Sequence, residues 1–258
     1  MTPLAEFGPY KLAGLAALIF FGGVVDALAG GGGLVTIPAY LAFGLDPRFL
    51  LGTNKLSSCI GTAAASLNYQ RNQRLDLAAM APGFAAALLG AVLGATAAKS
   101  LGASGIRILV LVALPLVGWF IYSKHGFGRE DRSASLGGAL KRRETALALP
   151  IGVYDGFFGP GTGLFFALAQ VRWCRRDLLG ATVRAKFLNL TTNLAALATF
   201  LLAGRVDIPL GLLMAAASVA GNWTGSHLGL KNGPKAIRPA VLLVCFGLFA
   251  KLLLDYLK

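Results

Sequence analysis

An aspartate and four consecutive glycines interrupt a long apolar stretch near the start of this chain. Asp26 and the run Gly30–Gly33 lie within residues 12–44, which otherwise look like a membrane helix. A lipid-facing helix would avoid both features, because a carboxylate is costly in hydrocarbon and a glycine weakens a helix by up to about 1 kcal/mol. Such a break is tolerated at membrane depth where protein or a water-filled cavity surrounds it. The stretch therefore predicts a broken membrane segment that lines a site.

A second break of the same kind occurs in the other half of the chain. Asp155 precedes the glycine-rich segment 159–163 inside the apolar residues 146–171. Broken hydrophobic segments at corresponding positions of two halves are the best sequence indication of a transporter's binding site. The two breaks together predict one site built from both halves.

The composition indicates a polytopic membrane protein. Of 258 residues, 56% are hydrophobic and 14% are charged, whereas a soluble domain has about 25% charged residues. At roughly 20 residues per span, the chain has room for about eight to ten spans. The net charge of +13 comes from basic residues in short loops, where they set orientation. There is no basic domain or motif for nucleic acid, so we expect the lipid bilayer as partner and no nucleic acid.

Several features recur at a constant separation of 131 residues (for example, 207 − 76), which predicts an internal duplication. The fold class expected is an all-α integral membrane protein with two homologous halves, each with one broken segment and three transmembrane helices. The first repeat is 1–122, a basic cytoplasmic linker follows at 123–145, and the second repeat is 146–258. The matched residues are Asp46 with Asp177, Lys55 with Lys186, Arg74 with Arg205, Gly90 with Gly221, Gly94 with Gly225, and Thr96 with His227.

Unbroken helices are expected at 53–69, 77–98, 106–122, 180–203, 209–229 and 236–256. The excess of basic loop residues changes sides between the halves, which favours halves inserted in opposite orientations. The broken segments 12–44 and 146–171 would then each enter and leave the membrane on one side. The alternative is eight plain spans in two parallel four-helix halves. The Gly-x-x-x-Gly pairs serve either internal packing or a homodimer.

The charged residues beside the breaks suggest an anion site. Lys55 and Lys186 occupy equivalent positions, and two lysines with the free N–H groups of broken helices could hold an anion. Each lysine could instead reach the membrane interface or pair with an aspartate. Asp26 and Asp155 either carry coupled protons or order the backbone of the breaks. The residues predicted to bind the substrate are Gly30, Gly31, Gly32, Gly33, Asn54, Lys55, Gly159, Gly161, Thr162, Gly163, Lys186 and Asn189.

Other chemistry lacks residues to support it. The two histidines and three cysteines are scattered, so we expect no metal site and no cofactor other than a coupling ion. No catalytic constellation is evident, and the glycine run is not followed by the Lys-Ser/Thr of a phosphate-binding loop. The chain is therefore predicted not to be an enzyme and not to use ATP by itself.

The residues around both breaks resemble one protein family. The blocks are Asp-x-x-x-Gly-Gly-Gly-Gly at 26–33, Thr-Asn-Lys-Leu at 53–56, Asp-Gly-Phe-Phe-Gly-Pro-Gly-Thr-Gly at 155–163 and Ala-Lys-Phe-Leu-Asn at 185–189. They are similar to the sulfite exporter TauE/SafE family, especially its YfcA-type probable membrane transporters, over about residues 12–256. The resemblance implies a multi-pass inner-membrane permease for small sulfur-containing anions such as sulfite, thiosulfate or organosulfonates.

The sequence therefore predicts a secondary-active transporter of small anions that works by alternating access between its two repeats. An anion or solute channel with the same breaks is the main alternative, and a membrane protein for a different small metabolite is another. A membrane enzyme and an assembly factor are further alternatives that lack a supporting motif.

Overall fold

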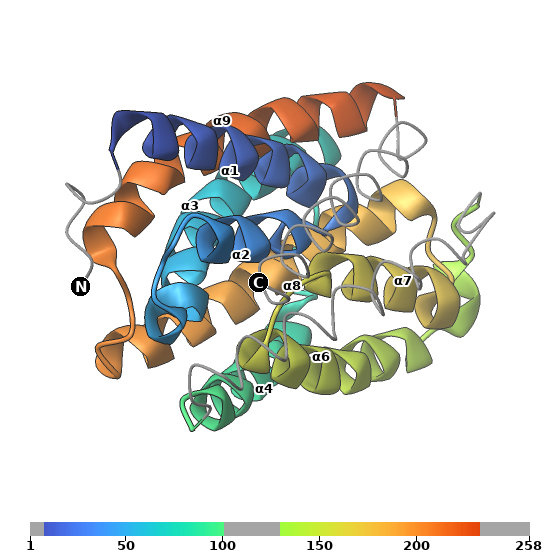
Figure 1. The fold of residues 1–258 in the computed structure, drawn as a ribbon. Helices are drawn as coiled ribbons and strands as arrows, with labels where there is room; N and C mark the ends of the chain where they lie inside the picture. The colour runs from blue at the N-terminus through green and yellow to red at the C-terminus, as the bar shows by residue number, and fades with distance from the viewer. Residues whose placement is uncertain (1–7, 101–129, 233–258) are drawn as a thin grey trace, which may run out of the picture.

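The computed structural model describes residues 8–100 and 130–232, and within these ranges the chain is helical without strands (Figure 1). The predicted helices at 106–122 and 236–256 lie outside the described residues. The elements are, in chain order, α1 (Pro9–Ala29), α2 (Gly33–Ala42), α3 (Pro47–Gln73), α4 (Ala81–Ala98), the short 3-10 helix η2 (Ser133–Leu136), α6 (Ala139–Phe157), α7 (Thr162–Cys174), α8 (Leu178–Leu202) and α9 (Ile208–Asn232).

Both predicted breaks are confirmed, and each turns the chain back on itself. In the first hairpin, α2 returns along α1, so that a Cβ atom on Gly14 would lie 3.1 Å from the Phe43 ring. In the second hairpin, α7 returns along α6, and Arg143 at one end donates a hydrogen bond to the carbonyl of Trp173 at 2.9 Å. The outer ends of the two arms therefore lie together in each hairpin. A segment that enters and leaves the membrane on one side requires this arrangement.

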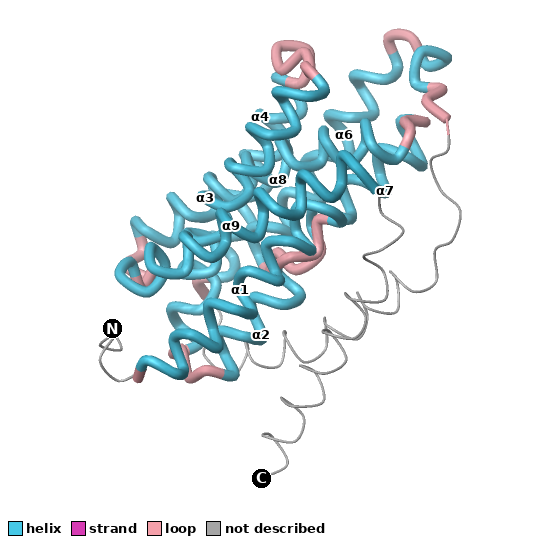
Figure 2. Tube along the Cα trace, turned by 90° about the horizontal axis from the view of Figure 1, so that it is seen from above, coloured by secondary structure: helices cyan, strands magenta, loops and turns pink. Residues whose placement is uncertain are grey.

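Helices α3 and α8 run in opposite directions where they touch. Lys55 Nζ donates a hydrogen bond to Asn193 Oδ1 at 2.7 Å, and earlier on α3 a Cβ atom on Gly52 would lie 3.0 Å from Phe200 Cβ. Contacts that advance along α3 thus move backward along α8. The two helices lie in the middle of the bundle, between α1, α2 and α9 on one side and α4, α6 and α7 on the other (Figures 1 and 2).

Helix caps explain why some boundaries differ from the predicted ones. Helix α3 begins at Pro47, earlier than the expected residue 53, because the Asp46 side chain accepts a hydrogen bond from Arg48 N at 2.9 Å and proline suits the first helical position. It continues through most of the predicted loop at 70–74 and ends at Gln73, after which Arg74 has φ 47°. Helix α6 begins at Ala139, so the end of the predicted linker 123–145 is helical.

Each half packs its first helix against the fourth helix of the other half. Helix α4 lies on α6, where Cβ atoms on Gly90 and Gly94 would clash with the carbonyl oxygens of Leu149 and Val153. Helix α9 lies on α1 in the same way, with Gly221 and Gly225 against the carbonyl oxygens of Phe20 and Val24. The missing side chains let the backbones approach closely. The Gly-x-x-x-Gly pairs thus serve packing inside the protein.

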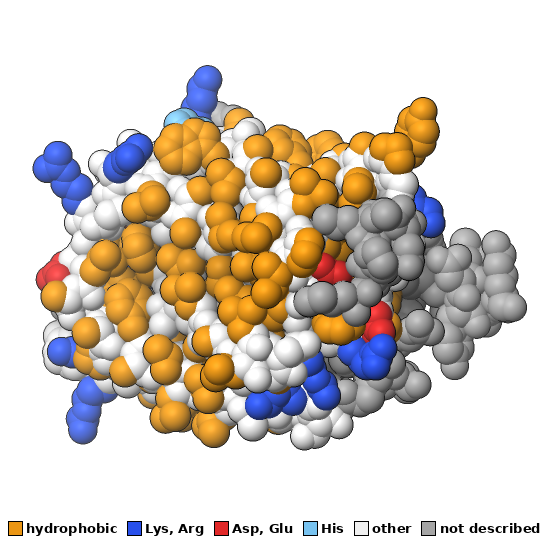
Figure 3. All heavy atoms as spheres, turned by 90° about the vertical axis from the view of Figure 1, so that its left-hand side faces the viewer, with side chains coloured by type: hydrophobic (Ala, Val, Ile, Leu, Met, Phe, Trp, Pro, Cys, Tyr) orange, Lys and Arg blue, Asp and Glu red, His pale blue; other side chains and the backbone are white. Residues whose placement is uncertain are grey.

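The outside of the bundle is apolar. Exposed leucines include Leu88, Leu89 and Leu93 on α4 and Leu212 and Leu213 on α9. Figure 3 shows hydrophobic side chains spread across one face, with lysine and arginine side chains toward its edges. Within the described residues three helices are long and apolar enough to cross a membrane, namely Pro9–Ala29, Ala81–Ala98 and Leu178–Leu202.

Candidate functional site: two helix breaks and two crossed ion pairs

The two helix breaks touch each other directly. Leu164 N donates a hydrogen bond to the Gly30 carbonyl at 3.3 Å. A Cβ atom on Gly30 would lie 2.2 Å from the Gly163 carbonyl carbon, and one on Gly33 would lie 3.0 Å from Pro160 Cα. Gly30 also has φ 73°, in the left-handed region that glycine adopts without penalty. Glycine is required here by both the local conformation and the neighbouring chain.

Hydrogen bonds within each segment fix the shape of the breaks. The Gly30 N–H caps α1 by donating to the Asp26 carbonyl at 2.8 Å. In the second half, Thr162 Oγ1 donates to the Gly159 carbonyl at 2.7 Å, and Tyr154 Oη donates to the Pro160 carbonyl at 2.6 Å. Helices α2 and α7 begin directly after these turns. Their N-termini, which carry partial positive charge, therefore start at the contact between the breaks.

Two buried ion pairs connect the halves crosswise. Lys55 Nζ on α3 lies 2.8 Å from Asp155 Oδ2, and Lys186 Nζ on α8 lies 2.9 Å from Asp26 Oδ2. The side chains of Lys55, Lys186 and Asp155 are at most 4% exposed, and that of Asp26 is 12% exposed. Of the alternatives that the sequence left open for the lysines, pairing with an aspartate is the arrangement found, with each lysine reaching the aspartate of the other half.

Two polar residues that sequence reasoning missed complete the pairs. Asn193 Oδ1 accepts the hydrogen bond of Lys55, and Thr62 Oγ1 donates to Asp26 Oδ2 at 3.0 Å. Thr62 and Asn193 are themselves 131 residues apart, and each follows the lysine of its own helix by seven residues. That spacing places both on the lysine face of the helix, so the repeat combined with helical periodicity could have identified them.

The four charges sum to zero, and not all of their hydrogen-bonding capacity is used. Apart from the ion pairs, neither the Asp155 carboxylate nor the Lys186 ammonium has a hydrogen-bond partner in the described structure. An ammonium has three donors, and a carboxylate has about four acceptor sites. Removing such charges from water costs several kcal/mol per ion, which only close pairing offsets. The arrangement is therefore electrically balanced, and a ligand of either charge would have to displace one of the paired groups.

The remaining predicted residues are close to the breaks but have different roles. Asn54 Oδ1 accepts a hydrogen bond from Thr36 Oγ1 at 2.6 Å, which ties α3 to α2. Gly32 packs against Asp26, where an added Cβ atom would be 2.5 Å away. Gly31 lies in the same turn, and Gly161 (φ 80°) precedes α7. Asn189 is buried on α8, and the hydrogen bond described for it is made by its backbone carbonyl.

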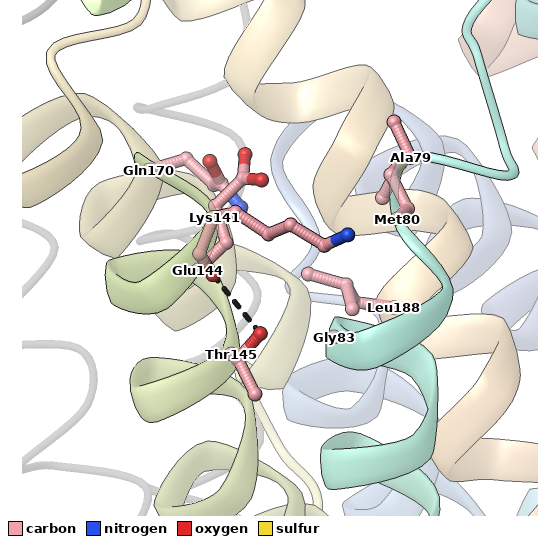
Figure 4. A pocket seen from close by; sticks show the side chains of 8 residues that line it. All are labelled: Ala79, Met80, Gly83, Lys141, Glu144, Thr145, Gln170 and Leu188. Atoms are coloured by element: carbon pink, nitrogen blue, oxygen red, sulfur yellow. Dashed lines mark hydrogen bonds between the residues drawn. The ribbon is translucent and has the colours of Figure 1, made fainter. Parts of the chain in front are cut away.

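The open ends of the two hairpins differ in polarity. At the second hairpin, Arg176 binds Glu144 Oε1 at 2.7 Å and Gln170 Oε1 at 3.2 Å. A cleft of about 10 Å³ adjoins this network, and Figure 4 shows Lys141 of α6 reaching across it toward α4. In the first hairpin, Leu15 precedes Asp26 by 11 residues, as Glu144 precedes Asp155, and Leu45 directly precedes Asp46, as Arg176 precedes Asp177. Both leucines are buried. The described residues contain no cluster of His, Cys, Asp or Glu that could hold a metal ion.

Broken helices that meet at buried charges, within a bundle that is apolar outside, are typical of membrane transporters. Comparison with known proteins identifies the family. The model of the family described as "Sulfite exporter TauE/SafE" matches residues 15–252. The chain belongs to this family.

Similar curated proteins are named as membrane transporters. The chain is 36% identical to the probable membrane transporter protein YfcA of Escherichia coli K12, over 96% of this chain and 91% of that protein. It is also 36% identical to the probable membrane transporter protein ORF9 of a Sinorhizobium species, over 95% and 94% of the two chains. A probable membrane transporter protein of Haemophilus influenzae is 36% identical over 97% of both chains. No solved structure matches the chain.

Proposed function

We propose that this protein is a secondary-active transporter of small anions in the inner membrane, with its binding site between the two helix breaks. The observation that carries the proposal is the pair of buried lysines beside two helix N-termini, each held by a carboxylate of the other half. Lysines and helix N-termini both favour an anion. In the state described here the two aspartates occupy the place of that anion on the lysines.

The substrate we propose is a small sulfur-containing anion, such as sulfite, thiosulfate or an organosulfonate. The family description supports this class, whereas the printed names of the relatives give no substrate. A compact oxyanion has several acceptor oxygens. It could therefore accept hydrogen bonds from both ammonium groups and from the N-terminal N–H groups of α2 and α7.

The arrangement favours a carrier over a channel. Asp155 and Lys186 have no exposed surface, so these two charged groups are not open to solvent in this state. Helices α3 and α8 run in opposite directions, and α1 packs on α9 as α4 packs on α6. Both observations support two inverted halves. Inverted halves provide two related conformations that open the site alternately to each side.

Anion flux into proteoliposomes tests the proposal. We would compare sulfite, thiosulfate, a taurine-like sulfonate, sulfate and a carboxylate, with and without a pH gradient. We expect saturable uptake of a sulfur anion that shows counterflow and that is lost in Lys55→Ala and in Lys186→Ala. No flux of any anion from folded protein would refute the anion assignment. Flux that does not saturate and shows no counterflow would establish a channel instead.

A further inference from the structure

A row of polar side chains on α9 has no counterpart on the equivalent helix of the other half. Ser218, Asn222 and Ser226 follow one another at each turn of α9, and all three are buried. The corresponding residues of α4, 131 positions earlier, are Ala87, Ala91 and Ala95, which are fully buried. Because α4 makes the same glycine-mediated packing with alanines, packing does not require the polar residues of α9.

The same asymmetry is present on the helix that faces α9. On helix α3, Asn68 Nδ2 donates a hydrogen bond to Ser226 Oγ at 2.7 Å, and Ser66, two residues earlier, is buried as well. An added Cβ atom on Gly61 would lie against Ser218 Oγ, so the two helices are in direct contact. At the position of Ser66, α8 has the apolar Leu197, whereas at the position of Asn68 it has Thr199.

The two ends of the row differ in solvent access. At the inner end, Thr62, one turn before Ser66, donates its hydrogen bond to Asp26. At the outer end, the exposed residue His227 places Nδ1 3.2 Å from Asn68 Nδ2 and 3.0 Å from the Trp223 carbonyl. That nitrogen therefore faces a donor from α3 and an acceptor from α9.

Between these ends the row has unused hydrogen-bonding capacity. Ser66 Oγ and Asn222 Oδ1 are buried without a hydrogen-bond partner in the described structure. Burying a polar atom without a partner is costly, which is a reason to look for a bound water or a function. Water molecules that bridge these atoms would make the row continuous from His227 to Thr62.

We propose that this row is a proton path, and that Asp26, not Asp155, binds the proton that is coupled to transport. The proposal rests on the anion transport proposed above. A proton from the solution passes through His227 and the row and binds the Asp26 carboxylate, which becomes neutral. The Lys186 ammonium, released from its ion pair, then holds the anion, and a singly charged anion and the proton move together without net charge.

The surroundings of the two aspartates agree with this division of roles. Besides Lys186 from α8, the titratable group that faces Asp26 within residues 8–100 and 130–232 is Tyr69 from α3, whose hydroxyl donates to the Ala27 carbonyl at 2.9 Å. Asp155 lies fully buried against Lys55, on helix α6, whose neighbour α4 carries alanines in place of the row. Asp26 is therefore the carboxylate with a polar route to the surface.

Variants that copy the other half test the path. The triple variant Ser218→Ala, Asn222→Ala, Ser226→Ala and the single variant His227→Thr introduce the residues of α4. We expect both to keep anion counterflow at equal pH and to lose accumulation driven by a pH gradient. Thr96→Ala, at the position equivalent to His227, is the matched control and should keep both activities. Full gradient-driven accumulation in the triple variant would overturn the proposal.

An infrared measurement tests the proton site without transport. In wild-type protein, acidification should produce a carboxylic-acid carbonyl band that is absent in Asp26→Asn and present in Asp155→Asn. The band should form more slowly in the triple variant. A band that disappears in Asp155→Asn but not in Asp26→Asn would overturn the assignment. Wild-type protein that shows this band but carries no anion would refute the proposed transport alone.

Discussion

The contact between the two breaks can be tested by adding a single methyl group. In Gly30→Ala the new Cβ atom would lie 2.2 Å from the Gly163 carbonyl carbon, where an ordinary contact begins near 3.4 Å. Separating two pieces of backbone by that difference resembles an overpacked core, which costs about 1–3 kcal/mol. The left-handed φ of 73° adds about 1–2 kcal/mol for a residue with a side chain. We expect a loss of unfolding free energy of about 2–5 kcal/mol, together with loss of anion flux.

Two control variants separate the two contributions. Gly204 has φ 65° and no atom within 4 Å of an added Cβ, so Gly204→Ala should show the conformational cost alone and retain flux. Gly163→Ala places its Cβ atom 2.5 Å from Gly30 Cα without a positive φ, so it should show the contact cost and lose flux. Thermal unfolding in detergent and proteoliposome flux are the two assays. Equal unfolding temperatures for Gly30→Ala and Gly204→Ala, with normal flux in both, would refute this reasoning.

The charged pairs give three further predictions. Lys55→Ala leaves the Asp155 carboxylate buried without its partner and should cost about 3–5 kcal/mol, whereas Lys55→Met with Asp155→Leu should regain most of the unfolding free energy but no flux. Glu144→Leu alone should lower the unfolding temperature, and adding Arg176→Leu should restore it, because leucines occupy both positions in the first hairpin. The side-chain hydrogen bond from Arg48 holds the pKa of Asp46 below its ordinary value. This stabilisation is present above the ordinary carboxyl pKa and is lost as the pH falls through the lowered pKa. Acid unfolding of Asp46→Asn, which keeps the helix cap, should lack that contribution, as circular dichroism would show.

Much of the site could be predicted because polar groups stand out in an apolar sequence. Asp26 and Asp155 are costly in a membrane segment, and the glycines that follow them marked both breaks. Lys55 and Lys186 were found because they recur at a constant separation. These signals are local or periodic, so one sequence is enough to show them.

The partners of these residues could not be predicted in the same way. Lys55 pairs with Asp155, although Asp26 is closer to it in the sequence. This choice depends on how the halves pack together, and no local pattern encodes it. Thr62 and Asn193 are ordinary residues for a helix when taken singly. The early start of α6 was missed because its first turns are rich in lysine and arginine, which read as a linker although both are good helix formers.

The exchange of helices between the halves has a consequence for how the protein is made. The face of α1 at Phe20 and Val24 packs against Gly221 and Gly225, which are synthesised about two hundred residues later. Until α9 is inserted, the first hairpin lacks its main neighbour, and until α8 is inserted, Lys186 is not there to neutralise Asp26. Neither half can therefore complete its own assembly, and the site forms only after helices of the second half have been made. A ribosome that stopped after the first half would leave a bare carboxylate in the membrane, which quality-control proteases could recognise.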